Sequence, residues 1–270
     1  MKNFHLKDWF LACNSFNTPT AKLLANSIGI GYGSNPKKSR NKVIRWGYSG
    51  DLERINNSIT HSLPNPDSIK NCANKLKTLE ILKNSKVKVP QFFTSAEQIR
   101  DKKLKFPIYC RKKFHTMGRD IILINNMDEA LNSFRDGRYL VEGIDCRKEY
   151  RIHVFCGDVI SASKKYFGEE LWNELGKPKT KDTIRNNSNG WRYYDVKDLN
   201  NIPKDVLEEA KKAVKALGLL WGAVDIIRSN DKISYVLEVN SAPGLREKRV
   251  EIYADKFKKL IEKINKGENV

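Results

Sequence analysis

The sequence lacks the features of membrane, secreted and disulfide-stabilised proteins. No apolar run reaches the ~20 residues that a membrane-spanning helix needs. The N-terminal segment has no secretory pattern, because Asp8 interrupts its apolar stretch. The five cysteines are odd in number and scattered, and no CxxC spacing occurs. We therefore expect reduced thiols in a cytoplasmic protein that does not contact a membrane.

Histidine and acidic residues are also scarce. The four histidines are dispersed, and no motif sets one beside a serine or cysteine, so a Ser/His/Asp or Cys/His nucleophile is not expected. The 50 lysines and arginines exceed the 32 aspartates and glutamates, giving a net charge of +18. A chain this basic favours a polyanionic partner, which includes a nucleotide and leaves nucleic acid open.

The patterns divide the 270 residues into three parts. Residues 1–68 predict a small N-terminal α/β lobe, residues 69–138 a second lobe and residues 139–270 a third. Mixed strands and helices with hairpins, instead of strict βαβ alternation, predict an α+β fold. Helices are predicted at Thr20–Ile28, Ser68–Leu82, Asp128–Phe134, Asp205–Leu217 and from Val250 to Ile264, the last packing on the sheet. Strands are predicted at Lys42–Trp46, Pro107–Arg111, Ile121–Ile124, Tyr139–Ile144, Glu149–Phe155, Val159–Lys164, Leu220–Arg228 and Ile233–Val239, and Phe167–Gly190 predicts a loop.

The last two strands carry the most informative residues. Leu220–Arg228 and Ile233–Val239 predict a hairpin. Because side chains alternate across a strand, Glu238 and Asn240 point to one face, and an even-length register brings Asp225 to that face. Two carboxylates and an amide oxygen are costly to bury unpaired among apolar residues, and a hard cation removes that cost. Mg²⁺ takes few protein carboxylates and completes its shell with water and phosphates. The set therefore predicts a Mg²⁺–triphosphate site; the alternative is a solvated strand end.

The motifs around these residues resemble those of ATP-grasp carboxylate–amine ligases. The Gly-x-x-Asp motif that ends at Asp225 and the Glu-x-Asn-x-x-Pro-Gly motif that starts at Glu238 are similar to strands of that family. The similar group includes ribosomal-protein glutamate ligases and D-alanine–D-alanine ligases. Over about residues 68–265 the resemblance implies an ATP-grasp fold, in which two α+β lobes clamp ATP. It also implies that Asp225, Glu238 and Asn240 hold Mg²⁺ (or Mn²⁺) ions that bridge the phosphates of ATP.

The resemblance also assigns the nucleotide contacts. Lys75, with Lys77 as the alternative, stands where the family has a phosphate-binding lysine, although Asn74 replaces the usual aspartate before it. Arg111 ends the strand that normally supplies a second such lysine, and Lys112 or Lys113 can share this role. Arginine remains charged and can form two hydrogen bonds to one phosphate group. The implied nucleotide-binding residues are Lys75, Arg111, Lys113, Gly118, Glu142, Gly143, Ile144 and Glu149.

Three further segments complete the implied ATP site. Phe114–Asp120 resembles the glycine-bearing phosphate lid, here with Gly118 as its one glycine, and His115 and Arg119 are additional candidates. Tyr139–Ile144 resembles the strand edge that binds adenine. Glu149 matches the ribose-binding position, and the alternative for this carboxylate is a local ion pair.

In the resembled family a carboxylate attacks the γ-phosphate of ATP, and an amine then displaces phosphate from the acylphosphate. Arg185, Arg151 and Lys164 are the cations implied for this catalysis, with Arg185 as the first choice. The acceptor is a small carboxylate plus an amine from an amino acid, a peptide or a modified nucleobase. Asn14–Gly33 and Phe167–Asn189 are expected to select it. Two alternatives are a kinase on the same fold and a nucleic-acid-binding protein without catalysis.

Overall fold

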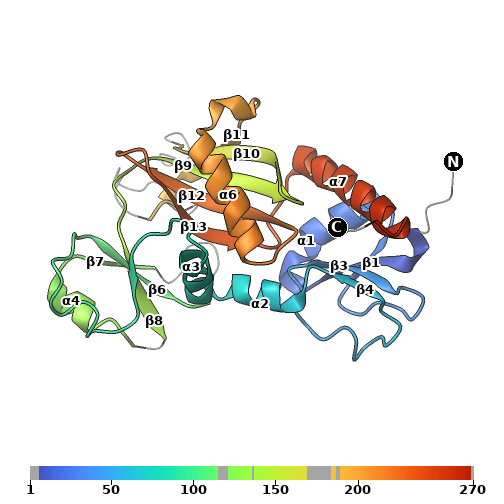
Figure 1. Ribbon diagram of the computed structural model, residues 1–270, viewed down its shortest axis with the longest axis horizontal. Helices are drawn as coiled ribbons and strands as arrows, with labels where there is room; N and C mark the ends of the chain where they lie inside the picture. The colour runs from blue at the N-terminus through green and yellow to red at the C-terminus, as the bar shows by residue number, and fades with distance from the viewer. Residues whose placement is uncertain (1–5, 115–120, 136, 169–183, 187–188, 269–270) are drawn as a thin grey trace.

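The computed structural model of the chain describes residues 6–114, 121–135, 137–168, 184–186 and 189–268. These residues form three sheets with helices packed on them, so the predicted α+β class is confirmed. Figure 1 shows the sheet of β5 to β8 at one end of the molecule, the sheet of β9 to β13 in the middle and the N-terminal sheet at the other end. No helix in these ranges has both the length and the apolar character needed to cross a membrane.

The N-terminal lobe is a parallel sheet of order β2-β1-β3-β4 with helix α1 packed on it. Its elements are η1 (Leu6–Asp8), β1 (Trp9–Cys13), η2 (Ser15–Asn17), α1 (Thr18–Ile28), β2 (Gly31–Gly33), β3 (Lys42–Trp46) and β4 (His61–Leu63). The helix ends at Gly29, whose φ of 91° is the left-handed conformation that favours glycine. Strand β1 is missing from the prediction because all five of its residues are buried, so no alternation marks it.

The helix predicted at Ser68–Leu82 is wrong in one respect, because the structure divides it into two. Helix α2 (Pro66–Ala73) and helix α3 (Lys75–Asn84) meet at Asn74, whose backbone is extended (φ −84°, ψ 103°). The Asn74 side chain accepts a hydrogen bond of 3.1 Å from the backbone nitrogen of Lys77. Asn74 therefore acts as an N-cap that restarts the helix, and it places Lys75 in the first turn of α3.

The second lobe is a four-stranded antiparallel sheet of order β5-β8-β6-β7. Its elements are β5 (Phe92–Phe93), β6 (Ile108–Lys112), β7 (Ile122–Ile124), α4 (Met127–Leu131) and β8 (Arg138–Glu142). Phe93, Ile108, Cys110 and Leu140 share a small apolar core with α4. This separate core makes the lobe a unit that packs against the rest of the chain through α3.

The central sheet is antiparallel, with the order β11-β10-β9-β12-β13. It is followed in the chain by the last long helix. Its elements and their neighbours are β9 (Cys146–Phe155), β10 (Asp158–Phe167), β11 (Trp191–Asp195), η4 (Leu199–Asn201), α6 (Lys204–Ala216), β12 (Trp221–Ser229), β13 (Ser234–Asn240) and α7 (Glu247–Asn265). Strand β11 is a finding of the structure that the sequence prediction does not contain.

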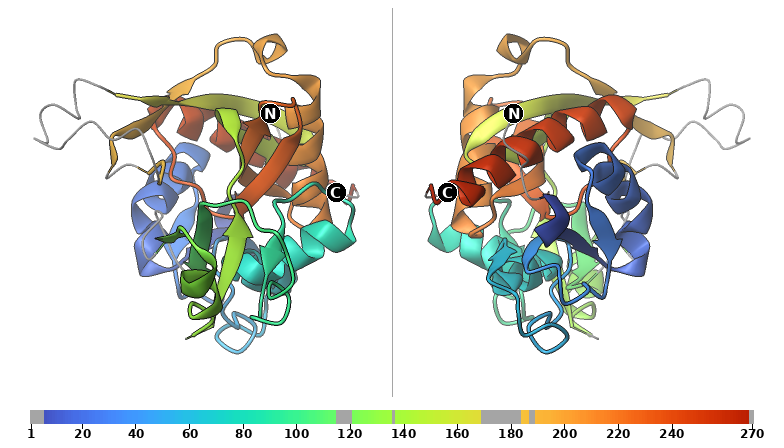
Figure 2. Two further views of the ribbon diagram at one scale, coloured as in Figure 1. Left: turned by 90° about the vertical axis from the view of Figure 1, so that its left-hand side faces the viewer. Right: turned by 90° about the vertical axis from the view of Figure 1, so that its right-hand side faces the viewer.

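The two faces of the central sheet have different surroundings. Helix α6 covers the face that contains Tyr150, Ile152, Val224 and Ile226, and these residues form one apolar core with it. In both end views of Figure 2, α6 and the N-terminal lobe lie on opposite sides of this sheet. The face toward the N-terminal lobe is apolar only at one end, near Phe155, where α7 covers it. The remainder of that face carries charged side chains and forms the candidate site.

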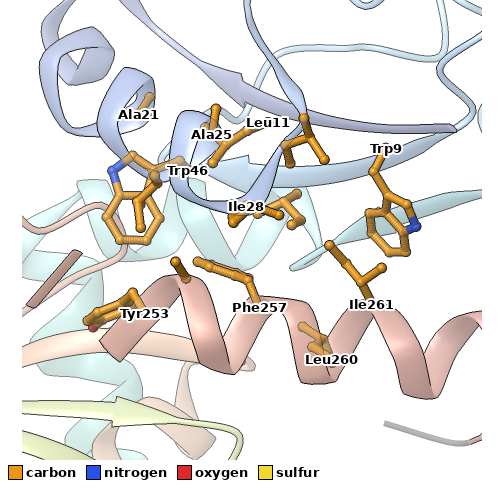
Figure 3. Packing of buried hydrophobic residues seen from close by; sticks show 14 of the residues in the cluster. Trp9, Leu11, Ala21, Ala25, Ile28, Trp46, Tyr253, Phe257, Leu260 and Ile261 are labelled. Atoms are coloured by element: carbon orange, nitrogen blue, oxygen red, sulfur yellow. The ribbon is translucent and has the colours of Figure 1, made fainter. Parts of the chain in front are cut away.

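Helix α7 packs between the central sheet and the N-terminal lobe. The Phe257 ring lies 4.9 Å from that of Trp221 in the sheet and 6.2 Å from that of Trp46 in the N-terminal lobe. Figure 3 shows the buried side chains of α7 facing Trp46 and the apolar side of α1. The prediction that this helix packs on the sheet is confirmed, and the helix also attaches the first lobe to the third.

Candidate active site

The β12–β13 hairpin brings together the three predicted metal ligands. Asp225 is paired with Glu238, and Ala223 is paired with Asn240. Paired residues share a face of the sheet, so all three side chains face the N-terminal lobe, where the sequence predicts that they converge. A β-bulge lies next to Asp225, between it and Ile226.

Glu238 lies among cations from helix α3 and strand β6. Its carboxylate is 3.4 Å from Nη2 of Arg111 and accepts a 3.1 Å hydrogen bond from the Asn240 side chain. Nζ of Lys75 donates to the backbone oxygen of Val239 at 3.4 Å. Burial would raise the pKa of Glu238, but the charges of Lys75 and Arg111 and the Asn240 hydrogen bond hold that pKa well below its ordinary value. Glu238 is therefore an anion at neutral pH.

Asp225 is paired with the neighbouring strand. Nε and Nη2 of Arg151 each donate to one of its carboxylate oxygens at 2.7 Å. The guanidinium carbon of Arg151 lies 4.5 Å from the centroid of the Tyr193 ring. Burial alone would lower the pKa of Arg151, but Asp225 raises it. Arg151 is therefore fixed between a carboxylate and an aromatic face.

Glu149, two residues before Arg151 on the same face, forms the next charged group. Its carboxylate forms ion pairs with Nζ of Lys165 at 2.6 Å and with Nη1 of Arg185 at 3.1 Å. The local ion pair named as the alternative for Glu149 is present in the structure, and the ribose contact stays a prediction. Arg185 also stacks on Trp191, with 4.7 Å between its guanidinium carbon and the ring. The structure thus brings Arg151 and Arg185, two of the three cations predicted for catalysis, to one face.

Lys164, the third predicted cation, is not brought to this face. It is paired with Tyr150 on one side and Tyr194 on the other, and Nζ donates to the Asn201 backbone oxygen at 3.3 Å. Tyr150 belongs to the face covered by α6. The next residue, Lys165, points to the charged face instead, because successive side chains alternate. The structure therefore places Lys165 where Lys164 was expected.

The second lobe contributes the predicted nucleotide contacts. Lys75 is buried, and its backbone nitrogen donates to the Lys113 backbone oxygen at 2.7 Å. This hydrogen bond joins the start of α3 to the end of β6, where Arg111 is also buried. Lys75 and Arg111 therefore both face Glu238, while Lys113 is exposed at the end of the strand. Gly118, His115 and Arg119 lie outside the described residues.

The predicted adenine-binding edge follows β8. The backbone nitrogen of Glu142 donates to Gln91 at 2.8 Å, and Gly143 and Ile144 lie directly after the strand, both half-buried. A Cβ on Gly143 would lie 2.5 Å from the Pro107 backbone oxygen, so only glycine fits there. The close approach of these two backbones fixes the position of the strand end.

The donor set is suited to Mg²⁺ together with phosphate. No cluster of three or more His, Cys, Asp or Glu side chains with metal-binding geometry occurs in the described ranges. The predicted ligands are instead the carboxylates of Asp225 and Glu238 and the amide of Asn240. This number matches the few protein oxygens that Mg²⁺ uses when phosphates supply the other ligands. Around them lie more cations than anions: Lys75, Arg111, Arg151, Lys165 and Arg185 against Glu149, Asp225 and Glu238. The excess positive charge favours an anionic ligand.

The N-terminal lobe approaches the site through the turn after β3. A Cβ on Gly47 would lie 2.6 Å from the Asn17 side chain and 2.7 Å from that of Ala242. Ala242 follows Asn240 by two residues, and Asn17 also donates to the Trp46 backbone oxygen at 3.4 Å. The turns after β1 and β3 therefore meet the chain just beyond the predicted metal ligands.

Comparisons with known proteins agree with this architecture. A family model of the RimK-like ATP-grasp domain matches residues 181–264. D-alanine–D-alanine ligase from Bacillus anthracis aligns with a TM-score of 0.66 and 14% identity, over 97% of this chain and 98% of that one. The ATP-grasp ligase PsnB, complexed with a phosphomimetic variant of minimal precursor, Mg and ADP, aligns with a TM-score of 0.65 and 14% identity, over 94% of this chain and 97% of that one. D-cycloserine synthetase DcsG aligns with a TM-score of 0.64 and 15% identity, over 94% of this chain and 99% of that one. No curated protein sequence matches the chain.

These matches define the class of the protein: the chain has the ATP-grasp fold, as the sequence motifs imply. The resemblance to ATP-grasp proteins is confirmed by the family model over residues 181–264, and the matched structures, at 14% and 15% identity, have the same fold. The family model covers β11 to α7, the segment that contains all three predicted metal ligands.

Three residues of the site are absent from the prediction. Lys165, Trp191 and Tyr193 all face the charged group that contains Glu149. The sequence contains only a short signal for two of them: Trp191 and Tyr193 are separated by the polar residue Arg192, but Tyr194 interrupts the alternation. A strand with one polar face would be expected to alternate over four residues or more, so these five residues are too irregular to predict the strand from sequence.

Proposed function

We propose that this chain is an ATP- and Mg²⁺-dependent ligase that joins a carboxylate to an amine through an acylphosphate and releases ADP and phosphate. The observation that carries the proposal is the pairing of Asp225 with Glu238 and of Ala223 with Asn240 at the centre of a cationic face. Proteins of the same fold whose names describe ligases of alanine and other amino acids support it.

The proposed nucleotide position follows from the placement of the two lobes. Adenine would bind the strand edge at Glu142, Gly143 and Ile144, and the phosphates would extend toward Lys75 and Arg111. Lys113 and Gly118 would add phosphate contacts from the end of β6 and the segment after it. Asp225, Glu238 and Asn240 would hold Mg²⁺, which when bound supplies charge neutralisation between the phosphate oxygens. Two Glu238 neighbours, Lys75 and Arg111, then carry positive charge for the triphosphate.

The proposed chemistry needs positioning and charge stabilisation more than a protein nucleophile. An acceptor carboxylate oxygen attacks the γ-phosphorus, the bond to the β,γ-bridging oxygen breaks, and ADP leaves. The amine then attacks the acyl carbon, phosphate leaves with the bonding electron pair, and the amine loses a proton. Arg151, Lys165 and Arg185 would stabilise the negative charge that develops on the phosphoryl and acyl oxygens. Lys165 replaces Lys164 in this role because it shares their face.

We further propose an amino acid or a small peptide as the acceptor. Two of the matched ligases are named for D-alanine and for L-amino acids, and PsnB is complexed with a variant of its minimal precursor. The turns after β1 and β3 border the metal ligands in this chain and would contact the acceptor. The chain segment beginning at Asn14 would then take part in substrate selection.

The test is ADP and phosphate release with Mg²⁺ and ATP across pooled carboxylates and amines, with and without nucleic acid. Turnover that requires both a carboxylate and an amine supports the ligase. Glu238→Gln should abolish this turnover, while Glu208→Gln, a matched change on the exposed side of α6, should leave it intact. ADP release without amine dependence would indicate a kinase. No turnover, together with salt-sensitive nucleic-acid binding that Glu238→Gln leaves unchanged, would refute the proposal.

A further inference from the structure

Strand β11 presents a row of side chains to the candidate site from the edge of the central sheet. Trp191, Tyr193 and Asp195 are paired in register with Phe167, Lys165 and Ser163 of β10. Because Ser163 is in turn paired with Arg151, these three residues of β11 share the face of Arg151 and Asp225. The intervening residue, Tyr194, points to the opposite face, where it contacts Tyr166 with 5.7 Å between the rings.

Each of the two aromatic side chains on the site face covers a cation of the proposed catalytic group. The Tyr193 ring lies 4.5 Å from the guanidinium carbon of Arg151 and 5.2 Å from Nζ of Lys165. The Trp191 ring lies 4.7 Å from the guanidinium carbon of Arg185. These distances are within the range of cation–π contacts, and arginine favours such stacked arrangements.

The same cations are also paired with carboxylates. Arg151 binds Asp225 through Nε and Nη2, and Lys165 and Arg185 share Glu149. Nη1 of Arg151 has no hydrogen-bond partner within the described ranges. A carboxylate alone could fix such a cation, but it would cancel the charge that an anionic ligand needs. An aromatic ring restricts the position of a cation without neutralising it.

We propose that Trp191 and Tyr193 are positioning residues that hold Arg185, Arg151 and Lys165 for the acceptor carboxylate and the transferred phosphoryl group. The inference rests on the proposed ligase function, and it assigns to β11 a role that the motif residues do not have. The aromatic faces orient the three cations without neutralising them, and because these cations outnumber their two carboxylate partners, Asp225 and Glu149, one positive charge remains for an oxyanion. A long, flexible side chain that is fixed in this way loses less conformational freedom when the anion binds.

The test compares three substitutions on one strand. Tyr193→Leu removes the aromatic face, Tyr193→Phe keeps the ring and removes the hydroxyl, and Tyr194→Leu makes the same change as the first on the opposite face. Tyr193→Leu should lower kcat about 10-fold to 100-fold and raise KM for the carboxylate, because misplaced catalytic groups lose this much. The Kd for ATP should change less than about 3-fold, since the adenine edge, Lys75 and Arg111 lie outside β11. Tyr193→Phe should recover most of kcat, and Tyr194→Leu should resemble the unmodified protein.

A second readout does not depend on ligase turnover. Protons of the Arg151 side chain above the Tyr193 ring should show an upfield ring-current shift in the NMR spectrum. Tyr193→Leu should remove that shift, while Tyr193→Phe and Tyr194→Leu should retain it. If the unmodified protein has the shift but no ligase activity, the proposed function fails and the stacking stands. A full kcat in Tyr193→Leu, an equal loss in Tyr193→Phe, or an equal loss in Tyr194→Leu would each overturn the positioning role.

Discussion

Replacing Asp225 with asparagine separates its two roles, as a partner of Arg151 and as a proposed metal ligand. The change keeps the shape of the side chain and removes its charge, which leaves Arg151 without its carboxylate. Breaking a buried ion pair costs about 3–5 kcal/mol, whereas an exposed pair contributes about 0–1 kcal/mol. The Arg151 and Asp225 side chains are 27% and 14% exposed, and the Tyr193 contact remains. We therefore expect a loss of about 2 kcal/mol, an intermediate value.

Thermal unfolding without ligand measures the first role. A loss of about 2 kcal/mol should lower Tm by about 4–8 °C in a chain of this size. Adding Arg151→Met to Asp225→Asn removes the unpaired cation, so the double variant should recover part of the loss. Glu208→Gln breaks an exposed pair on α6 and should change stability by less than about 0.5 kcal/mol.

Unfolding with ligand measures the second role. Mg²⁺ and ATP at about 100 times Kd should stabilise the unmodified protein by about 2.7 kcal/mol. Asp225→Asn should lose most of this additional stabilisation, while Glu208→Gln should keep it. If Asp225→Asn unfolds at the wild-type temperature, the ion-pair reasoning is wrong. If its response to Mg²⁺ and ATP is unchanged, Asp225 is not a metal ligand.

Three further predictions test the site and its surroundings. Lys165→Met should lower kcat at least about 10-fold, as expected for loss of a group that stabilises developing charge. Lys164→Met should keep kcat within about 2-fold of the unmodified protein. Equal effects of the two substitutions would contradict the assignment of these lysines to opposite faces. Because the pKa of Glu238 is held below its ordinary value of 4.5, its charged form stabilises the fold above that value and this contribution is lost as the pH falls through the lowered pKa. The Tm difference between the unmodified protein and Glu238→Gln should therefore shrink below about pH 4.5, and a difference that grows on acidification would contradict this sign. Gly47→Ala should cost about 2–4 kcal/mol from left-handed backbone and overpacking, while Gly157→Ala, left-handed with open space around it, should cost about 1–2 kcal/mol in the same unfolding assay.

Sequence patterns predict the long elements well, because their apolar periodicity follows from one buried face. Helix α6 begins at Lys204, one residue before the predicted start, and its apolar stripe packs on the sheet. The helix break at Asn74 has no comparable signal, since apolar residues continue at helical spacing on both sides of it. A capping side chain there restarts the helix, and only the backbone conformation reveals it.

Strand β11 shows a different limit of sequence reasoning. It has five residues and follows a long polar segment, so its pairing with β10 depends on contacts distant in sequence. Tertiary context decides such short strands more than local preference does. The consequence for the site is large, because Trp191 and Tyr193 enter it only through this pairing.

Two β-bulges determine which side chains enter the site. In the β12–β13 hairpin, Arg228 is paired with Ser234, and continuing this register would set Asp225 opposite Leu237. The bulge beside Ile226 shifts the pairing by one residue, so that Asp225 is opposite Glu238. A one-residue shift exchanges the two faces of a strand. The predicted convergence of Asp225 with Glu238 and Asn240 is present, but it arises from a bulge instead of the regular even-length register that the prediction assumed.

The bulge in β10 has the opposite consequence for prediction. Near the turn Val159 is paired with Val154, and a regular register from there would place Lys164 opposite Glu149. The shift between Val159 and Ser161 instead pairs Lys164 with Tyr150, so Lys165 reaches Glu149. A regular register counted from the turn would therefore assign this lysine to the wrong face of the sheet, whereas simple alternation assigns the residues of β9 correctly. Since bulges re-aim side chains near active sites, a one-residue ambiguity in the sequence becomes a choice between the face of the candidate site and the α6 core.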